Sequence, residues 1–349
     1  MTVATAPTLR YIKNFVFSLT MVNSVLKFQK CLDSEFLNRS YKLYLLLCFV
    51  CCFSQNGKTQ QTIQLTQWSI HQLALNPAMS GIKPCPEVKM IYRNQYAGLD
   101  GAPNSGLATF SFPIDRKRME FFQPRHGLSF KYEYDKIGPF LSNRFNLGYA
   151  MHINFTVDRR ISLGVYGGLR QFSFNRDNVV TINPDPSVAV YTNSVLAPDF
   201  TIGSWWNDKK YYIGVTLQNL SGNKWQDVGT QSKYRFFPTL NAGYKLIVNE
   251  KWSLLPAGLI KFSNKAPVAL DLQTMTDFNN VFAIGLGYRN NEGIHAMMNI
   301  KVFKRLSISY AVDFITSKLR GTKQTHEISF SYSGCVDRRR TATACPLFE

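Results

Sequence analysis

The chain has 349 residues, and its formal net charge at pH 7 is +18. Its mean hydropathy is −0.14 and it has no run of about 20 apolar residues, which excludes a transmembrane helix in the mature protein. The basic residues are spread among turns without a recognition motif, so the charge favours anionic lipid headgroups or an acidic protein partner over nucleic acid.

Residues 1–54 are predicted to be an N-terminal extension followed by a signal peptide. Arg39 and Lys42 precede an apolar block at residues 43–53, which is too short to span a membrane and ends in small residues. The block begins far from Met1, which indicates an upstream mis-start or an unstructured extension. Cys51 lies in a poor lipobox, so a lipid-anchored protein is the less favoured alternative.

Residues 55–87 are predicted to form a periplasmic or plug-like segment before the strands. Asn76-Pro77 and the following Gly81 favour a turn, because proline fixes its own φ angle and disfavours helix in the residue before it. A folded outer loop and an inward plug both fit these turn motifs, and plain turn geometry is a simpler explanation than contact with a partner. A second group of turn residues indicates a structured loop between two strands: Gly98, Gly101 and Pro103.

The stretch from Arg144 to Thr156 shows the pattern that organises the rest of the chain. Side chains in a strand alternate between two faces, and here one face is apolar while the other is small and polar. A tilted strand of about eleven residues is also long enough to cross a bilayer. Further runs alternate in the same way at residues 161–169, 211–218, 240–248, 282–289, 306–314 and 328–332.

These runs predict an all-β fold, a transmembrane antiparallel β-barrel of the outer membrane, at residues 88–332 with about 14 strands. The alternation alone does not say which face is outside, so a secreted soluble β-protein is the alternative. Aromatic residues near strand ends, and a second face of Gly, Ser, Asn and charged residues, favour an apolar exterior in contact with lipid.

The connections between the runs alternate between tight and long. Tight turns fall at residues 158–159, 207–209, 249–251 and 303–304, and longer connections at 94–105, 173–193, 221–233 and 315–323. Bacterial barrels have short periplasmic turns and long outer loops, so the tight turns are predicted to be periplasmic. The long connection at 113–126 is the exception, because it falls on the side of the short turns.

The tight turns are rich in basic residues, which predicts a positive docking surface on the periplasmic rim. Ordinary solvated turns and headgroup anchors are the alternative explanation. The basic tail, residues 333–349, extends this surface, and Cys335 and Cys345 within it could close a disulfide loop in an oxidising compartment. The basic residues are Arg159, Arg160, Lys209, Lys210, Lys251, Lys304 and Arg305 in the tight turns, Arg116, Lys117 and Arg118 in the 113–126 connection, and Arg338, Arg339 and Arg340 in the tail.

The sequence contains no motif for catalysis, for a cofactor or for a metal, so the protein is predicted not to be an enzyme. His152 and Asn154 share the lumen face, but a lipase-like site also needs an activated serine, and no Gly-x-Ser-x-Gly motif is present. A second function remains open, a passive outer-membrane porin that prefers anions, because several cations face the lumen: Lys131, Arg170, Lys245 and Arg289.

Two motifs near the start of the mature chain resemble the opening signature of the PorP/SprF family. They are the stretch 75–81, LNPAMSG, and the stretch 92–103, YRNQYAGLDGAP, and weaker matches continue to about residue 332. The basic, cysteine-bounded tail departs from the family. The motif residues that the resemblance marks as an interface are Asn76, Pro77, Gly81, Tyr92, Arg93, Gln95, Gly98, Gly101 and Pro103.

The resemblance implies an outer-membrane barrel of the type IX secretion and gliding apparatus of Bacteroidota, not an enzyme. It also implies partners, namely the periplasmic ring and lipoprotein components of the secretion machine. A secreted adhesin or effector with a C-terminal signal domain is the implied client, which such a barrel helps to export or to hold at the cell surface.

Overall fold

The computed structural model describes residues 63–114, 123–156, 158–175, 194–222, 236–263, 266–316 and 324–334. The expected extension and signal peptide, residues 1–54, and most of the basic tail lie outside the described residues. The chain divides into a first unit, Met1–Ser54, and a second unit, Gln55–Glu349, which contains everything described below. Among the described residues, no helix has the length and apolar character needed to cross a membrane.

Two single turns of helix precede a long series of strands. The turns are α3 (Gln72–Leu75) and η1 (Pro77–Met79). The strands are β1 (Glu87–Asn94), β2 (Asn104–Pro113), β3 (Arg125–Ile137), β4 (Phe140–Asn154), β5 (Arg160–Phe174), β6 (Ser194–Asn207), β7 (Tyr211–Gln218), β8 (Phe237–Tyr244), β9 (Leu246–Ile247), β10 (Trp252–Ser263), β11 (Ala266–Phe278), β12 (Phe282–Arg289), β13 (Gly293–Phe303), β14 (Leu306–Ile315) and β15 (Thr325–Ser333).

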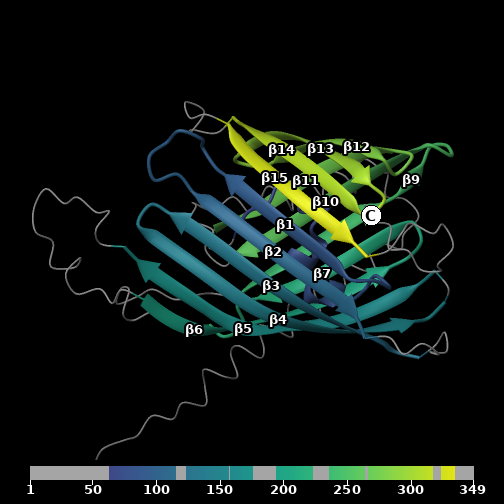
Figure 1. Ribbon diagram of the computed structural model, residues 1–349, viewed down its shortest axis with the longest axis horizontal. Helices are drawn as coiled ribbons and strands as arrows, with labels where there is room; N and C mark the ends of the chain where they lie inside the picture. Colours follow the sequence, from purple (N-terminus) through teal and green to yellow (C-terminus); the bar gives the residue numbers. More distant parts are fainter. Residues whose placement is uncertain are drawn as a thin grey trace, which may run out of the picture. The chain divides into compact units, whose positions relative to one another are not determined.

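The strands form one closed antiparallel barrel (Figure 1). Each strand pairs with its neighbours in the chain, β15 pairs with β1, and β10 pairs with β11, which closes the ring. Only Lys245 separates β8 from β9, and both pair with β10, so the two pieces act as one strand. The barrel therefore has 14 strands, which confirms the architecture that the alternating runs predict.

The burial pattern shows which face of the strands is outside. In β4, Arg144, Asn146 and His152 point into the barrel and are buried, whereas Leu147 and Tyr149 point outward and are 70% and 42% exposed. The same arrangement recurs around the ring, where large apolar side chains are exposed on every long strand. A soluble β-sandwich hides its apolar faces between its sheets, so this exterior belongs to a barrel that faces lipid.

Because the ring is antiparallel, alternate connections lie at the same end of the barrel. One end, which we name the short-turn end, carries the turns β4–β5, β6–β7, β9–β10, β11–β12 and β13–β14, together with the longer β2–β3 connection. The opposite end, the long-loop end, carries the connections β1–β2, β5–β6, β7–β8 and β14–β15. It also carries three short connections, β3–β4, β10–β11 and β12–β13, so the alternation of short and long connections is less regular than predicted.

Candidate functional site

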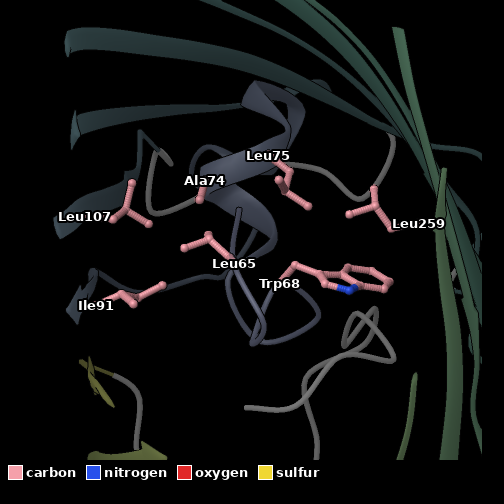
Figure 2. Packing of buried hydrophobic residues seen from close by; sticks show 7 residues of the cluster. All are labelled: Leu65, Trp68, Ala74, Leu75, Ile91, Leu107 and Leu259. Atoms are coloured by element: carbon pink, nitrogen blue, oxygen red, sulfur yellow. The ribbon is translucent and has the colours of Figure 1, made fainter. Parts of the chain in front are cut away.

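Residues 63–82, the plug segment, occupy the lumen of the barrel before the chain enters β1. Every residue from Leu65 to Ile82 is buried. Figure 2 shows Ala74 and Leu75 of α3 between Ile91 and Leu107 on one side and Leu259 on the other. A segment that the barrel encloses in this way closes the lumen from within.

Burial of apolar side chains stabilises the plug segment in the lumen. Trp68 is fully buried, and Leu73 and Leu75 are 7% and 8% exposed. Full burial of one large apolar side chain contributes about 1.5–3 kcal/mol, so these three together oppose release of the segment by roughly 5–9 kcal/mol. The closed arrangement is therefore expected to dominate unless a partner compensates for this loss.

The barrel wall also donates hydrogen bonds to backbone carbonyl groups of the plug segment. Its two single helical turns leave most of its carbonyl groups without an internal donor, and a buried carbonyl needs one. Side chains from the strands supply those donors, and most are cations. The donors and their acceptor carbonyls are Arg289 to Leu65 (2.9 Å), Lys89 to Ile70 (2.8 Å), Tyr166 to Leu73 (2.7 Å), Lys131 to Ala74 (3.4 Å) and Arg160 to Ile82 (3.1 Å).

The turn at Asn76–Gly81 is seated on a row of small residues in the wall. Gly127, Ala150, Gly164 and Gly203 are register partners across β3, β4, β5 and β6, and we name them the small-residue row. A Cβ atom built on Gly164 would lie 2.4 Å from the backbone of the plug segment, and one on Gly127 would lie 2.1 Å from a plug carbonyl oxygen. The close approach of the two backbones therefore requires glycine in the wall.

Polar side chains fix the same turn against the wall. The Asn76 side chain donates to the carbonyl oxygens of Ser204 (2.9 Å) and Val215 (3.3 Å), and its own oxygen accepts from the Ala78 backbone N–H (3.0 Å). The His152 ring Nε2 lies 2.8 Å from the Ser80 carbonyl oxygen. Because a carbonyl only accepts, Nε2 donates there and carries the proton. The other ring nitrogen, Nδ1, lies 2.7 Å from the Ser162 hydroxyl, which donates to it, so His152 links the plug segment to β5.

A buried charge cluster joins the start of the plug segment to the wall near the long-loop end. Arg93, which is 2% exposed, contacts Glu327 (3.0 Å) and Asp313 (2.7 Å) through its two terminal nitrogens. The same carboxylates accept from the plug segment, since the Thr66 hydroxyl donates to Asp313 (2.7 Å) and the Thr66 backbone N–H donates to Glu327 (2.9 Å). Arg289 forms a neighbouring ion pair with Asp271 at 2.7 Å. We name these five charged side chains the Arg93 cluster.

Two small cavities are present, and one of them is lined in part by the plug segment. One lies between Leu65, Leu75 and Lys261, and the other lies beside Arg93 and His295. Each measures about 20 Å³, which is room for about one water molecule. Within the described part of the chain, no group of three or more His, Cys, Asp or Glu residues is placed to hold a metal ion.

The structure divides the predicted motif residues among three places. Asn76, Pro77, Gly81 and Arg93 are buried in the lumen, where they belong to the plug segment and its seat. Tyr92 points outward and is 52% exposed. The other motif residues form the β1–β2 connection at the long-loop end, where Gly98 and Gly101 adopt positive φ angles and the Gln95 N–H donates to the Pro103 carbonyl oxygen at 2.9 Å: Gln95, Gly98, Gly101 and Pro103.

The basic residues of the tight turns all lie at the short-turn end, and all but one of them are exposed. Arg159 pairs there with Asp208 at 3.0 Å while its side chain stays 58% exposed. The prediction is wrong for Arg160, which points inward, is 1% exposed and donates to the Ile82 carbonyl. Two groups lie outside the described residues: Arg116, Lys117 and Arg118 of the 113–126 connection, and the tail residues Arg338, Arg339 and Arg340.

Cys85 closes the junction between the plug segment and β1. It is disulfide-bonded, and it is the only cysteine among the described residues, so its partner lies outside them. Its sulfur lies 3.6 Å from the Ser333 hydroxyl, and the Gly334 N–H donates to the Pro86 carbonyl oxygen at 2.7 Å. The expected pair, Cys335 and Cys345, lies outside the described residues.

We expect Cys335 to pair with Cys85 rather than with Cys345. Glu87 is the register partner of Ser333, and two more steps of the same antiparallel register would bring position 85 opposite position 335. Opposite residues in such a pair have Cα atoms about 4.5–5.5 Å apart, which is within the range of a disulfide. Peptide mapping without reduction should yield a peptide that joins residues 85 and 335, and a peptide that joins 335 to 345 would contradict this pairing.

The sequence analysis did not identify the wall residues that contact the plug segment. Glu327, which accepts from both the plug segment and Arg93, lies in one of the weaker family matches but had no role assigned, and the small-residue row was not singled out. A glycine or alanine at an inward position in four consecutive strands was visible in the sequence, but its meaning depends on strand register. Lys131, Arg170 and Arg289, predicted to face the lumen, do so and are buried.

The comparisons with known proteins include one family match. Residues 57–332 match the family described as type IX secretion system membrane protein PorP/SprF. No curated protein matches the chain. Among solved structures, the toluene transporter TbuX of Ralstonia pickettii is similar (9% identity, TM-score 0.47, 79% of this chain and 96% of that one). The outer membrane protein Omp33 of Acinetobacter baumannii is also similar (10% identity, TM-score 0.43, 73% of this chain and 100% of that one). So is a FadL homologue of Pseudomonas aeruginosa (11% identity, TM-score 0.43, 79% of this chain and 99% of that one).

The family match, residues 57–332, includes both the plug segment and the strands of the barrel. Its opening motif is the turn that sits on the small-residue row, and its second motif carries Arg93. With its lipid-facing exterior, the chain is an outer-membrane barrel that belongs to the PorP/SprF family of type IX secretion membrane proteins.

Proposed function

We propose that this barrel is a non-enzymatic accessory of the type IX secretion and gliding machinery. It assists the export or surface attachment of a secreted adhesin or effector, and its periplasmic side docks ring and lipoprotein components. The observation that supports this proposal is an occupied lumen in a chain of this family. A passive porin needs an open aqueous channel, whereas an accessory barrel needs only a stable wall and exposed ends.

The lumen cations support the same conclusion. The sequence alone allowed them to line an anion-preferring pore, but Lys131 and Arg289 donate to plug carbonyls. Both also pair with carboxylates of the wall, since Lys131 lies 3.0 Å from Glu133 and Arg289 lies 2.7 Å from Asp271. Cations that are occupied in this way hold the plug segment and do not attract anions through the barrel.

The short-turn end is the proposed docking side, because short turns face the periplasm in bacterial barrels. Its exposed cations, Lys209, Lys251, Lys304 and Arg305, form a basic rim. Such a rim suits an acidic protein surface, where opposite charge speeds encounter and sets orientation. The tail triplet Arg338–Arg340 follows β15, which also ends at this side of the barrel.

A pull-down in mild detergent from the native membrane tests this proposal. The tagged barrel should recover type IX ring components or one large adhesin with a C-terminal signal domain, identified by mass spectrometry. Charge reversal of the tail, with Arg338, Arg339 and Arg340 all changed to Glu, should reduce recovery of the periplasmic partners. Recovery of the folded barrel alone, in good yield, would contradict the accessory function.

A matched control places the same change at the other end of the barrel. Lys318, Arg320 and Lys323 belong to the β14–β15 connection, and their combined change to Glu removes the same charge from the long-loop end. This variant should keep its periplasmic partners. An equal loss in both triple variants would show that net charge alone, and not the periplasmic rim, controls recovery.

A further inference from the structure

The lipid-facing wall has a groove where β8 meets β10. It is apolar and measures about 620 Å³, and it extends over β7, β8, β10, β11 and β12. Its floor is made of small outward residues, Ala242, Pro256 and Gly258, of which Ala242 and Gly258 are register partners. Leu272 and Leu286 rise beside them and are 48% and 66% exposed.

The groove coincides with a break in the hydrogen-bond ladder. The pairing of β8 with β10 stops at Gly243 and Ala257, and pairing resumes only at Leu246 of β9 and Leu254. Pro256 lies in the gap and has no N–H to donate, which explains why the ladder fails there. The lumen-facing residues Tyr212 and Gln273 also line the groove, so the wall is thin at this point.

We propose that this groove binds one acyl chain of a membrane phospholipid. The groove is continuous with the lipid-facing exterior of an outer-membrane barrel, so hydrocarbon is what surrounds it. The groove is shallow and open to the surrounding lipid, which suits an acyl chain that lies along the wall. A chain lying there would cover the ladder break and separate the lumen from the surrounding lipid.

The orientation of the groove supports a phospholipid as the occupant. Tyr211 and Tyr244 line one end of it, and both lie beside the short-turn end of their strands. Tyrosine at this level belongs to the aromatic girdle that marks the membrane interface. The groove therefore begins where a headgroup lies and continues toward the middle of the wall, as an acyl chain does in a leaflet.

Photo-crosslinking of the full, folded barrel tests this site. The barrel is placed in bilayer discs that contain a phosphatidylethanolamine with a diazirine in its acyl chain, and mass spectrometry maps the crosslinks. We expect them to be concentrated on peptides of β8, β10 and β12. Ala242→Phe fills the groove from its floor and should lower crosslinking there by about tenfold or more, since exclusion of two methylene groups removes that much binding.

Ala108→Phe is the matched control, because Ala108 also points outward but lies on β2, away from the groove. It should keep the wild-type crosslinks. Gly258→Leu provides a second groove variant if Ala242→Phe fails to show heat-modifiable migration, the sign of a folded barrel. Crosslinks spread evenly around the wall, or equal crosslinking in the groove variants and the control, would overturn the proposal.

Discussion

Gly164→Leu is expected to turn a closed barrel into a conducting one. A Cβ atom at this position would lie 2.4 Å from both the Pro77 carbonyl carbon and the Ala78 nitrogen. Both contacts are with backbone, which cannot rotate aside as a flexible side chain can, so the turn at η1 has to leave its seat. In planar bilayers the wild type should show no steady conductance, whereas the variant should show long-lived ohmic steps.

Gly167→Leu is the control for this experiment, because it makes the same change three residues further along β5. Gly167 points outward, and a Cβ atom there meets only the ring of Phe200 at 3.6 Å, an ordinary contact. The control should therefore stay closed. If a folded Gly164→Leu barrel conducts no better than the control, the plug segment does not close the lumen in the membrane. A conducting wild type would favour the passive porin instead.

The strand pattern predicted the barrel well wherever the lumen is polar. β4 and β15 alternate cleanly, because one face meets lipid while the other carries charged and other polar groups. β10 breaks the rule, because Leu255 and Leu259 point inward and are buried. Leu259 packs with Trp68 of the plug segment, so the lumen side of β10 is apolar. The alternation of apolar and polar residues identifies strands whose inner face is polar, so it does not identify β10, whose inner face packs against the plug segment.

The seat of the plug segment was not predictable from the sequence for a different reason. The small-residue row comes from four strands, and its first and last members are 76 residues apart in the chain. Only the register brings Gly127 and Gly203 to the same level of the wall, and a shift by one residue would turn each side chain to the opposite face. The turn at Asn76 was recognised, but the surface that it contacts depends on tertiary structure.

The basic character of the chain also needed the structure for its interpretation. Part of the charge is at the exposed rim, as predicted, but Lys89, Arg93, Arg160 and Arg289 are buried. These side chains serve plug carbonyls or wall carboxylates. The excess of basic residues thus reflects an irregular segment enclosed in a barrel as well as a surface for partners.

Arg93→Met is expected to produce the largest loss of stability among single substitutions in the lumen. The arginine fork contacts Glu327 and Asp313 at the same time, and both carboxylates also accept hydrogen bonds from Thr66. Removal of one partner of a buried ion pair costs about 3–5 kcal/mol, because the other charge is left uncompensated. The free energy of unfolding, measured in urea with the barrel in lipid vesicles, should fall by that amount.

Two further variants separate charge from geometry. Arg93→Lys keeps the cation, but a single ammonium lacks the fork that reaches both carboxylates, so an intermediate loss is expected. Arg159→Met removes an ion pair of similar length, 3.0 Å to Asp208, on a side chain that is 58% exposed. Exposed pairs contribute about 0–1 kcal/mol because water screens them, so this variant should unfold almost as the wild type does. Equal losses for Arg93→Met and Arg159→Met would mean that water reaches the Arg93 cluster, and hence that the plug segment does not seal the long-loop end of the lumen.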